Sequence, residues 1–278
     1  ANALNFRQLL ERGAGADGLA ARLQAVQGND LATIMYTSGS TGEPKGVMRS
    51  QDNLLANITN GGAITVSAPD ELTVNILSLN HLFGRFGFLK SAVTGRTTAL
   101  IEAAETKVDL PVIEQLSPTG LAVVPRIMER IWDCVLAQDG NQESWRNLEL
   151  LDDKMSSDGL SDADIRCFDE LRAQLRANVR RALGGRIKYV AYGGAAMPPR
   201  IMRFFDLIGI PLIGSYGSTE CGGVTLCGIG QNRPGNLGKP FANVQVRIAA
   251  DGEILVRDPT VSPGYFKNPE ATREAFDE

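Results

Sequence analysis

Apolar runs that read as strands alternate along this chain with longer segments of helical periodicity. The strand-like runs cover residues 31–36, 72–79, 97–101, 120–124, 187–192 and 211–216. The helix-like segments cover residues 52–62, 82–93, 107–116, 126–138, 160–183 and 198–208. Alternation of this kind is typical of parallel sheets, because each helix returns the chain to the start of the next strand. The sequence therefore predicts an α/β fold of layered, mostly parallel sheets with flanking helices.

The pattern changes near residue 235, where short strands replace the alternation. Residues 244–248 and 253–257 read as strands on either side of Asp251-Gly252, a pair that is typical of a hairpin turn. We therefore expect an α/β part over residues 1–234 and the start of a β-rich subdomain over residues 235–278.

Composition limits the partners of the chain. It has 278 residues, of which 43% are apolar, so it can bury a sizeable core. Its 28 Lys and Arg against 32 Asp and Glu give a net charge of -4, which excludes a strong general attraction to nucleic acid or anionic membranes. No apolar run approaches the ~18 residues of a membrane-spanning helix, and no charged-then-apolar leader opens the sequence. We expect neither a nucleic-acid partner nor a transmembrane segment.

The cysteines form no metal-binding or redox motif. Cys134, Cys167, Cys221 and Cys227 include no CxxC pair, and one histidine in the whole chain argues against a Cys/His zinc site. We expect four free thiols in the reducing cytoplasm, where they serve as small buried hydrophobic residues.

A loop rich in glycine and hydroxyl groups follows the first strand-like run. Residues 37–46 read Thr-Ser-Gly-Ser-Thr-Gly-Glu-Pro-Lys-Gly, and their glycines and Pro44 predict irregular structure. Backbone N–H groups, hydroxyls and a lysine are what a polyphosphate needs. The loop is not a Walker A loop, because Gly46 instead of Ser or Thr follows Lys45. On composition alone, a flexible surface loop fits equally well.

The full string from Tyr36 to Val47 resembles the phosphate-binding signature of the adenylate-forming, or AMP-binding, superfamily. This superfamily includes acyl-CoA synthetases, peptide-synthetase adenylation domains and beetle luciferases. Four more segments resemble its later motifs, in the same order: Gly193-Gly194-Ala195-Ala196, Tyr216-Gly217-Ser218-Thr219-Glu220, residues 235–240, and residues 252–272. Singly, such segments could be a tight turn, a core aromatic residue or a solvated acid. Five such segments in the order of the superfamily argue against these separate interpretations.

The resemblance implies a role for each matching residue. The β- and γ-phosphates of ATP would be held by Thr37, Ser38, Gly39, Ser40, Thr41, Gly42 and Lys45. The adenine would be framed by Gly193, Gly194, Ala195, Tyr216 and Gly217. Thr219 would bind the α-phosphate, and Glu220, with Thr37, would hold Mg²⁺. A carboxylate at a strand end suits this hard cation, which prefers oxygen ligands.

His81 is the sole histidine and follows the strand-like run over 72–79. One interpretation is a half-buried histidine that caps a helix. The resemblance implies another, in which His81 lies beside the substrate carboxylate, with Arg85 as a weaker candidate. Residues 124–132 resemble a stretch of the long- and medium-chain acyl-CoA synthetases, although an ordinary helix with an apolar stripe explains them too.

The resemblance implies ATP- and Mg²⁺-dependent activation of a carboxylic acid, in particular a fatty acid, to an acyl-adenylate, then transfer to coenzyme A. Lys45, Thr219, Glu220 and His81 would carry the chemistry. Three alternatives stay open: a fatty acyl-AMP ligase that loads an acyl carrier protein, a non-catalytic nucleotide-binding module, and a peptide-synthetase adenylation domain. The family continues into a C-terminal lid domain with a catalytic lysine. We expect this lid to be absent from residues 1–278, and turnover by these residues alone to be weak or absent.

Overall fold

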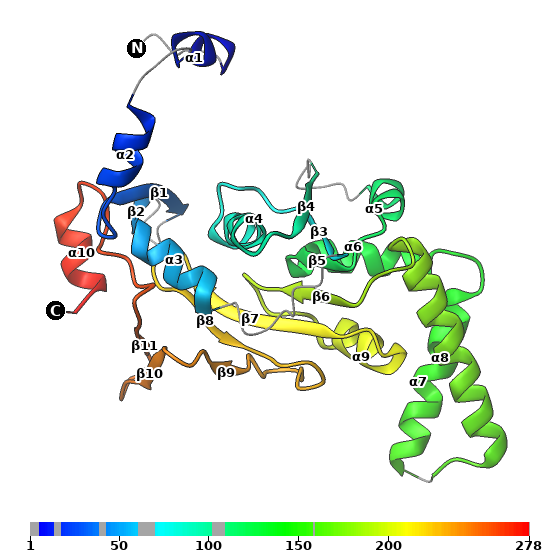
Figure 1. Cartoon of the computed structure of the whole chain (residues 1–278). Coiled ribbons are helices and arrows are strands. Elements are labelled where there is room, and N and C mark those ends of the chain that lie inside the picture. Colours follow the sequence, from blue (N-terminus) through cyan, green and yellow to red (C-terminus); the bar gives the residue numbers. More distant parts are fainter. Residues whose placement is uncertain are drawn as a thin grey trace.

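A seven-stranded sheet forms the centre of the molecule (Figure 1). The computed structural model describes residues 6–13, 18–38, 43–60, 70–101, 109–157 and 159–277. The strand order is β4-β3-β5-β6-β7-β8-β9. The first five strands are parallel to one another, β8 is antiparallel to β7, and β9 is antiparallel to β8. The seven strands are β3 (Leu72–Asn75), β4 (Thr97–Leu100), β5 (Gly120–Val123), β6 (Tyr189–Tyr192), β7 (Leu212–Ser218), β8 (Gly222–Leu226) and β9 (Lys239–Pro240). The predicted α/β fold with a mostly parallel sheet is confirmed.

Helices connect and cover the strands of this sheet. Those that the periodicity predicts are α3 (Gln51–Asn60), α4 (Leu82–Thr94), α5 (Leu110–Leu116), α6 (Pro125–Leu136), α8 (Asp162–Ala182) and α9 (Pro199–Ile208). Short helices α1 (Phe6–Gly13), α2 (Leu19–Ala25) and α10 (Pro269–Ala275) lie toward the two ends of the chain. Residues 61–62 and 107–108 of the predicted helical segments lie outside the described residues. None of the described helices is both long and apolar enough to cross a lipid bilayer.

Two antiparallel hairpins complete the described structure. The first joins β1 (Leu31–Ser38) to β2 (Pro44–Ser50), and the second joins β10 (Gln245–Ile248) to β11 (Ile254–Arg257) as the sequence predicts. The irregular structure predicted for residues 37–46 is wrong at both ends of that stretch, because Thr37 and Ser38 extend β1 and Pro44 opens β2. A proline is tolerated as the first residue of a strand, where its missing N–H breaks no ladder. Residues 39–42 lie outside the described residues.

The strand predicted over residues 72–79 is shorter than expected. It ends at Asn75, whose side chain is buried and redirects the backbone. The Asn75 Oδ1 atom accepts a hydrogen bond from the Leu77 N–H at 3.0 Å, and its Nδ2 atom donates to the Gly84 carbonyl at 2.8 Å. The side-chain amide of Asn75 therefore takes the place of strand-to-strand hydrogen bonds at this point, and the chain turns toward α4.

A long helix, α7 (Asn141–Ser157), is absent from the sequence-based prediction. Its composition is strongly polar, but Trp145 and Leu148 are buried in the main core, where Trp145 packs edge-on against Phe204 at 4.9 Å between ring centroids. Because only a narrow stripe of the helix is buried, its apolar pattern is too weak to detect without the neighbouring helices. Helix α7 packs against α8, and the two project together from one end of the molecule (Figure 1).

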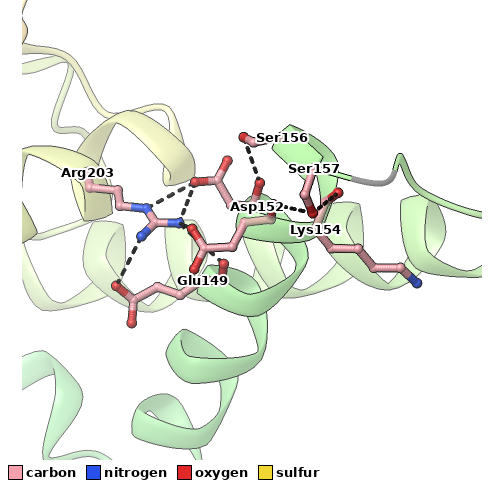
Figure 2. A network of polar contacts seen from close by, with 7 residues as sticks. Glu149, Asp152, Lys154, Ser156, Ser157 and Arg203 are labelled. Atoms are coloured by element: carbon pink, nitrogen blue, oxygen red, sulfur yellow. Dashed lines mark hydrogen bonds and ion pairs between the residues drawn. The ribbon is translucent and has the colours of Figure 1, made fainter.

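Charged contacts add to this packing between α7 and α9. Figure 2 shows that Arg203 of α9 contacts Asp152 and Glu149 of α7. The Arg203 Nη2 atom lies 2.7 Å from the Asp152 Oδ2 atom and also bonds Asp153, whereas Nη1 lies 3.9 Å from the Glu149 Oε1 atom. This partly exposed network joins α7 to α9.

The four cysteines are free thiols, as the sequence predicts. Their expected burial is correct for Cys227 but wrong for Cys134 and Cys167, which are exposed. Both lie on polar faces of their helices, so they contribute nothing to the core.

Gly217 is expected to be essential for the fold of the β7–β8 hairpin. A Cβ atom at this position would lie 2.2 Å from the Gly222 carbonyl oxygen, a backbone atom that cannot swing away. Gly217→Ala should therefore lower the free energy of unfolding by about 1–3 kcal/mol, measured by thermal or urea unfolding of the full-length protein. The matched control is Gly87→Ala inside α4, where a Cβ meets nothing within 4 Å and alanine favours the helix. Equal destabilisation by both substitutions would contradict this prediction.

Candidate active site

The β1–β2 hairpin places two of the predicted phosphate-binding residues, Thr37 and Lys45, side by side, and a third segment of the chain pairs with its edge. Thr37 pairs with Lys45 across the hairpin, so the hydroxyl-rich and lysine-bearing strands lie side by side. Residues 264–266 then add to β2: the Met48 N–H donates to the Gly264 carbonyl at 3.0 Å, and the Phe266 N–H donates to the Gly46 carbonyl at 2.7 Å. This pairing brings Tyr265 to the hairpin, more than 200 residues farther along the chain.

The Tyr216–Glu220 motif spans the end of β7 and the turn into β8. Tyr216, Gly217 and Ser218 belong to β7, and the turn begins at Thr219. The Ser218 hydroxyl accepts hydrogen bonds from the Glu220 N–H at 3.1 Å and the Cys221 N–H at 3.2 Å. A serine that binds the backbone two and three residues ahead stabilises a tight turn. The turn therefore presents the Glu220 side chain at the end of the strand.

A buried arginine lies behind this turn. Arg49 of β2 is 0% exposed, and its Nη1 atom donates to the carbonyl oxygens of Thr219 at 3.3 Å and Glu220 at 3.2 Å. Its Nε and Nη2 atoms are buried without a hydrogen-bond partner among the described residues. Burial lowers the pKa of Arg49 to about 10, against the opposing effect of nearby acidic groups that include Glu220 and Asp258. Arg49 thus remains charged at neutral pH and ties the Lys45 strand to the Glu220 turn.

Tyr265 makes a second connection between the hairpin and the turn. Its hydroxyl donates to the Glu220 Oε1 atom at 3.1 Å, and the Lys45 Nζ atom lies 5.2 Å from the centroid of its ring. Burial and the Glu220 carboxylate raise the pKa of Tyr265 to about 12, so the hydroxyl stays protonated at neutral pH. The contact of the Lys45 ammonium with the Tyr265 ring and the hydrogen bond to the Glu220 carboxylate both stabilise this arrangement.

These elements enclose a cavity of about 930 Å³. Among the residues assigned to the site from the sequence, those that line it are Thr37, Lys45, His81, Gly193, Gly194, Tyr216, Gly217, Thr219 and Glu220. Ala195 is exposed next to this group but is not part of the lining. The Ser38 side chain and residues Gly39, Ser40, Thr41 and Gly42 lie outside what the structure describes. The described residues predicted to bind the phosphates and those predicted to bind the adenine therefore line the same cavity.

The Gly193–Ala195 segment follows β6 directly, as its position after a strand-like run predicts. A Cβ atom at Gly193 would lie 2.8 Å from the Ser215 Oγ atom of β7, and Gly194 has a φ of +83°. Both positions thus favour glycine, one for space and one for backbone conformation. Burial raises the pKa of Tyr216, which lines the same region, and keeps its hydroxyl neutral.

His81 satisfies parts of both interpretations of the sequence. It occupies the residue before α4, but its side chain makes no capping hydrogen bond. The side chain is exposed rather than half-buried, and it lines the cavity. Arg85 instead donates to the Leu79 carbonyl at 2.9 Å and to the Thr33 hydroxyl at 2.5 Å, outside the cavity lining. Of these two residues, His81 is therefore the one placed to meet a ligand.

A family model described as "AMP-binding enzyme" matches residues 3–266. The chain belongs to the AMP-binding enzyme family. It is 32% identical over 290 residues to a long-chain-fatty-acid–CoA ligase, FadD15, of Mycobacterium tuberculosis, an alignment that covers 99% of this chain and 47% of that ligase. It is 30% identical over 271 residues to a carboxylic acid reductase of Segniliparus rugosus, covering 90% of this chain and 20% of the reductase.

The fold agrees with a solved structure of an adenylate-forming enzyme. The O-succinylbenzoate coenzyme A synthetase of Bacillus subtilis, in complex with ATP and magnesium ion, aligns with a TM-score of 0.63 at 21% identity. The alignment covers 91% of this chain and 46% of that synthetase. This similarity establishes the fold. The chain spans about half the length of the mycobacterial ligase that it matches.

The side chains of this AMP-binding enzyme suit a magnesium ion that arrives with a phosphate ligand. Within the described ranges, no three His, Cys, Asp or Glu side chains gather into a metal-binding cluster. The cavity instead offers the Glu220 carboxylate and the Thr37 hydroxyl. Mg²⁺ commonly takes one or two carboxylates from the protein and its other oxygens from phosphates and water. The donor set therefore fits Mg²⁺ bound with ATP and does not fit a closed structural metal site.

Arg49 and Tyr265 are the site residues that sequence reasoning missed. Tyr265 falls inside the matched segment 252–272, so the motif carried a signal for its importance but none for its contact with Glu220. Arg49 follows the phosphate-binding string by two residues and reads as an ordinary polar strand residue. Its burial depends on the turn 170 residues away, which no local pattern encodes.

Tyr265→Phe should weaken the binding of Mg²⁺ at the site without disturbing its packing. Phenylalanine keeps the ring beside Lys45 but removes the hydrogen bond to Glu220, which is worth about 1 kcal/mol. We expect roughly a fivefold rise in the Mg²⁺ concentration that gives half-maximal adenylation by the full-length protein. An unchanged Mg²⁺ requirement would contradict this role.

The same substitution has a signature in stability. Because the pKa of Tyr265 is raised, folding favours the neutral hydroxyl, and its contribution is fully present below the ordinary tyrosine pKa of about 10. That contribution is lost as pH rises from about 10 to about 12. The Phe variant, followed by chemical unfolding over this pH range, should lose less stability than the wild type.

Proposed function

We propose that the full-length protein activates a carboxylic acid with ATP and Mg²⁺, forming an acyl-adenylate and pyrophosphate, and then transfers the acyl group to coenzyme A. The observation that carries this proposal is the single cavity lined by Lys45, His81, Tyr216, Thr219 and Glu220. Residues suited to phosphates, to an aromatic base and to a carboxylate face the same space. Because the chain spans about half of its ligase relative, we assign the activity to the whole protein.

The residues of this chain act mainly by positioning and charge stabilisation. Thr37 to Lys45 hold the β- and γ-phosphates, and the Thr219 hydroxyl donates to the α-phosphate. Tyr216 packs on the adenine, beside the backbone of Gly193 and Gly194. His81 orients the substrate carboxylate for in-line attack on the α-phosphorus, so pyrophosphate leaves on the opposite side.

Glu220, with Thr37, is the proposed holder of Mg²⁺. When bound, the ion neutralises the charge that develops on the phosphate oxygens. Arg49 and Tyr265 fix Glu220 from behind and from the side, by the hydrogen bonds described above. The protein thus presents its carboxylate in one orientation before any ligand arrives.

The apolar part of the cavity indicates the kind of acid. Besides its polar groups, the cavity is lined by Ile76, Phe83, Phe86, Ile127 and Ile213. Such a wall favours a hydrocarbon chain, since burial of each CH₂ group contributes about 0.8 kcal/mol. We therefore propose a fatty or other largely apolar acid as the substrate.

The proposed CoA ligase and its alternative, a fatty acyl-AMP ligase, differ in the acceptor of the acyl group. The names of the two relatives given above both refer to a carboxylic acid, but one relative is called a CoA ligase and the other a reductase. We propose coenzyme A, with an acyl carrier protein as the alternative acceptor. We also propose a cytoplasmic location, because the four free thiols suit a reducing compartment.

The domain assignment is likewise a proposal. We divide the chain into an α/β part over residues 1–234 and the start of a β-rich part over residues 235–278, both within one AMP-binding domain. A C-terminal lid domain would complete the catalytic machinery in the full-length protein. Residues 1–278 alone should then turn over weakly or not at all.

The test of the adenylation step is acid-dependent exchange of labelled pyrophosphate into ATP by the full-length protein. Exchange with fatty acids supports the proposal, and exchange with amino acids alone would favour a peptide-synthetase domain. No exchange across a broad set of acids, in a protein that still binds ATP, would favour a non-catalytic nucleotide-binding module. Adding either coenzyme A or a phosphopantetheine carrier protein, and identifying the thioester, decides between the two acceptors.

A further inference from the structure

Two arginines of α8 meet at the end of α9. Gly209 follows the last residue of α9, and a Cβ atom at this position would lie 2.5 Å from the Arg176 Nη2 atom and 3.1 Å from the Arg172 Nη2 atom. The two arginines are four residues apart on α8, so they extend from the same face of the helix. The separation of their Nη2 atoms cannot exceed the sum of these two distances, so one small ligand can contact both guanidinium groups.

Most of the hydrogen-bond donors of this arginine pair are unused. The Arg176 Nε atom donates to the Ile208 carbonyl at the end of α9. Arg172 is half-buried, and it makes no hydrogen bond or ion pair with any residue that the structure describes. Its Nε atom is also shielded from solvent. Because a buried donor without an acceptor is unfavourable, the pair is better suited to a ligand that accepts hydrogen bonds than to an empty surface.

The positive charge of the pair is not balanced by a carboxylate. Burial and the charges of Arg172 and Arg180 lower the pKa of Arg176. Among the described residues no Asp or Glu side chain forms an ion pair with Arg172 or Arg176, whereas Arg203 of α9 contacts three carboxylates (Figure 2). The carbonyl groups at the end of α9 supply only a partial negative charge. An anion bound between the two guanidinium groups would relieve their repulsion.

The arginine pair lies far from the candidate active site. Gly209 precedes β7 and Thr219 follows it, and the 7 residues of this extended strand span about 23 Å. Neither Arg172 nor Arg176 lines the active-site cavity. A ligand bound by the pair is therefore distinct from the ATP and the acid of the proposed reaction.

We infer that Arg172 and Arg176 bind a phosphate group at a site separate from the proposed active site. The planar donors of a guanidinium group match phosphate oxygens, and such charge-assisted hydrogen bonds are about 2.8 Å long. A phosphate monoester carries a charge of about -1.5 to -2 at neutral pH, which balances most of the charge of two arginines. The phosphate group belongs to a soluble phosphate compound or to a phospholipid headgroup, which share this chemistry.

The test measures binding of inorganic phosphate to the full-length protein by isothermal titration calorimetry, in chloride buffer at constant ionic strength. Arg172→Gln should weaken this binding about tenfold, because it removes one charged partner of the phosphate. Arg172 has no hydrogen bond to lose, so the variant should unfold in chloride at the same temperature as the wild type. Arg172→Lys keeps the charge without the planar donors and should have an intermediate affinity. Arg166→Gln is the matched control, because Arg166 is exposed on the same helix and also lacks a described partner; its affinity should stay within twofold of the wild type.

Two further probes distinguish the sources of the phosphate group. Binding of glycerol 3-phosphate that Arg172→Gln weakens would assign the site to a soluble phosphate ester. Binding only of phosphatidylcholine vesicles that contain phosphatidic acid, again weakened by Arg172→Gln, would assign it to a lipid headgroup. No saturable binding of inorganic phosphate, the ester or the vesicles would overturn the inference. Binding that Arg172→Gln leaves unchanged, or that Arg166→Gln weakens equally, would overturn it as well, because the phosphate would then bind elsewhere. Neither result bears on the pyrophosphate exchange that tests the proposed function.

Discussion

Glu220→Gln is expected to reduce acid-dependent adenylation by the full-length protein roughly 100-fold, about 3 kcal/mol in activation free energy. Glutamine keeps the size of the side chain and an oxygen that accepts from the Tyr265 hydroxyl, so the turn should stay in place. It loses the negative charge that would hold Mg²⁺ against the phosphates. The rate of pyrophosphate exchange at several Mg²⁺ concentrations measures the loss.

The matched control for this substitution is Glu253→Gln. Glu253 is exposed at the β10–β11 turn, outside the cavity lining, so its replacement should leave the exchange rate within twofold of the wild type. Both variants should unfold at nearly the same temperature as the wild type. Wild-type exchange by the Glu220 variant would remove this residue from the metal site.

Arg49→Met is expected to lower adenylation at least tenfold while changing stability little. The guanidinium hydrogen-bonds to the backbone of Thr219 and Glu220, and methionine cannot replace those bonds. The same arginine carries two buried nitrogens without a partner in the described part, each of which costs about 1–3 kcal/mol. Methionine removes this cost, so the gain offsets the two lost hydrogen bonds. Function should therefore fall although the free energy of unfolding is nearly preserved.

Two measurements separate a local effect of Arg49 on the Glu220 turn from simple misfolding. The midpoint of thermal unfolding should stay within a few degrees of the wild type, since ~1 kcal/mol corresponds to about 2–4 °C in a domain of this size. Arg49→Lys should lie between wild type and Arg49→Met in exchange rate, because lysine keeps the charge but not the planar fork. A strongly destabilised Met variant with full activity in its folded fraction would show that Arg49 serves the fold alone.

Sequence reasoning predicted the parts of the molecule that local patterns encode. The strands at β5, β6 and β7 are apolar runs bounded by turn residues, and α8 has a sustained apolar period. The Gly193 segment follows β6 and the Tyr216 segment forms the end of β7, so their places at one edge of the sheet follow from the alternation. Parallel strands bring their carboxyl ends to the same edge, which is why these segments meet in one cavity.

The features that escaped prediction depend on contacts between distant segments. Helix α7 is too polar for its buried stripe to stand out before α8 and α9 cover Trp145 and Leu148. Pro44 reads as a strand breaker, yet it is accommodated at the first position of β2. The depth of Arg49 could not be read from its neighbours, because this residue packs behind a turn about 170 residues farther along the chain.

The proposed function requires that a substrate carboxylate attacks the α-phosphorus of ATP within this cavity. The most direct measurement uses an acid labelled with ¹⁸O in its carboxylate, with the full-length protein, ATP, Mg²⁺ and coenzyme A. Attack by the carboxylate, followed by thioester formation, leaves one labelled oxygen on AMP, which mass spectrometry detects. We predict one ¹⁸O per AMP formed and release of pyrophosphate. Unlabelled AMP, or formation of ADP and phosphate instead, would contradict the proposed adenylation.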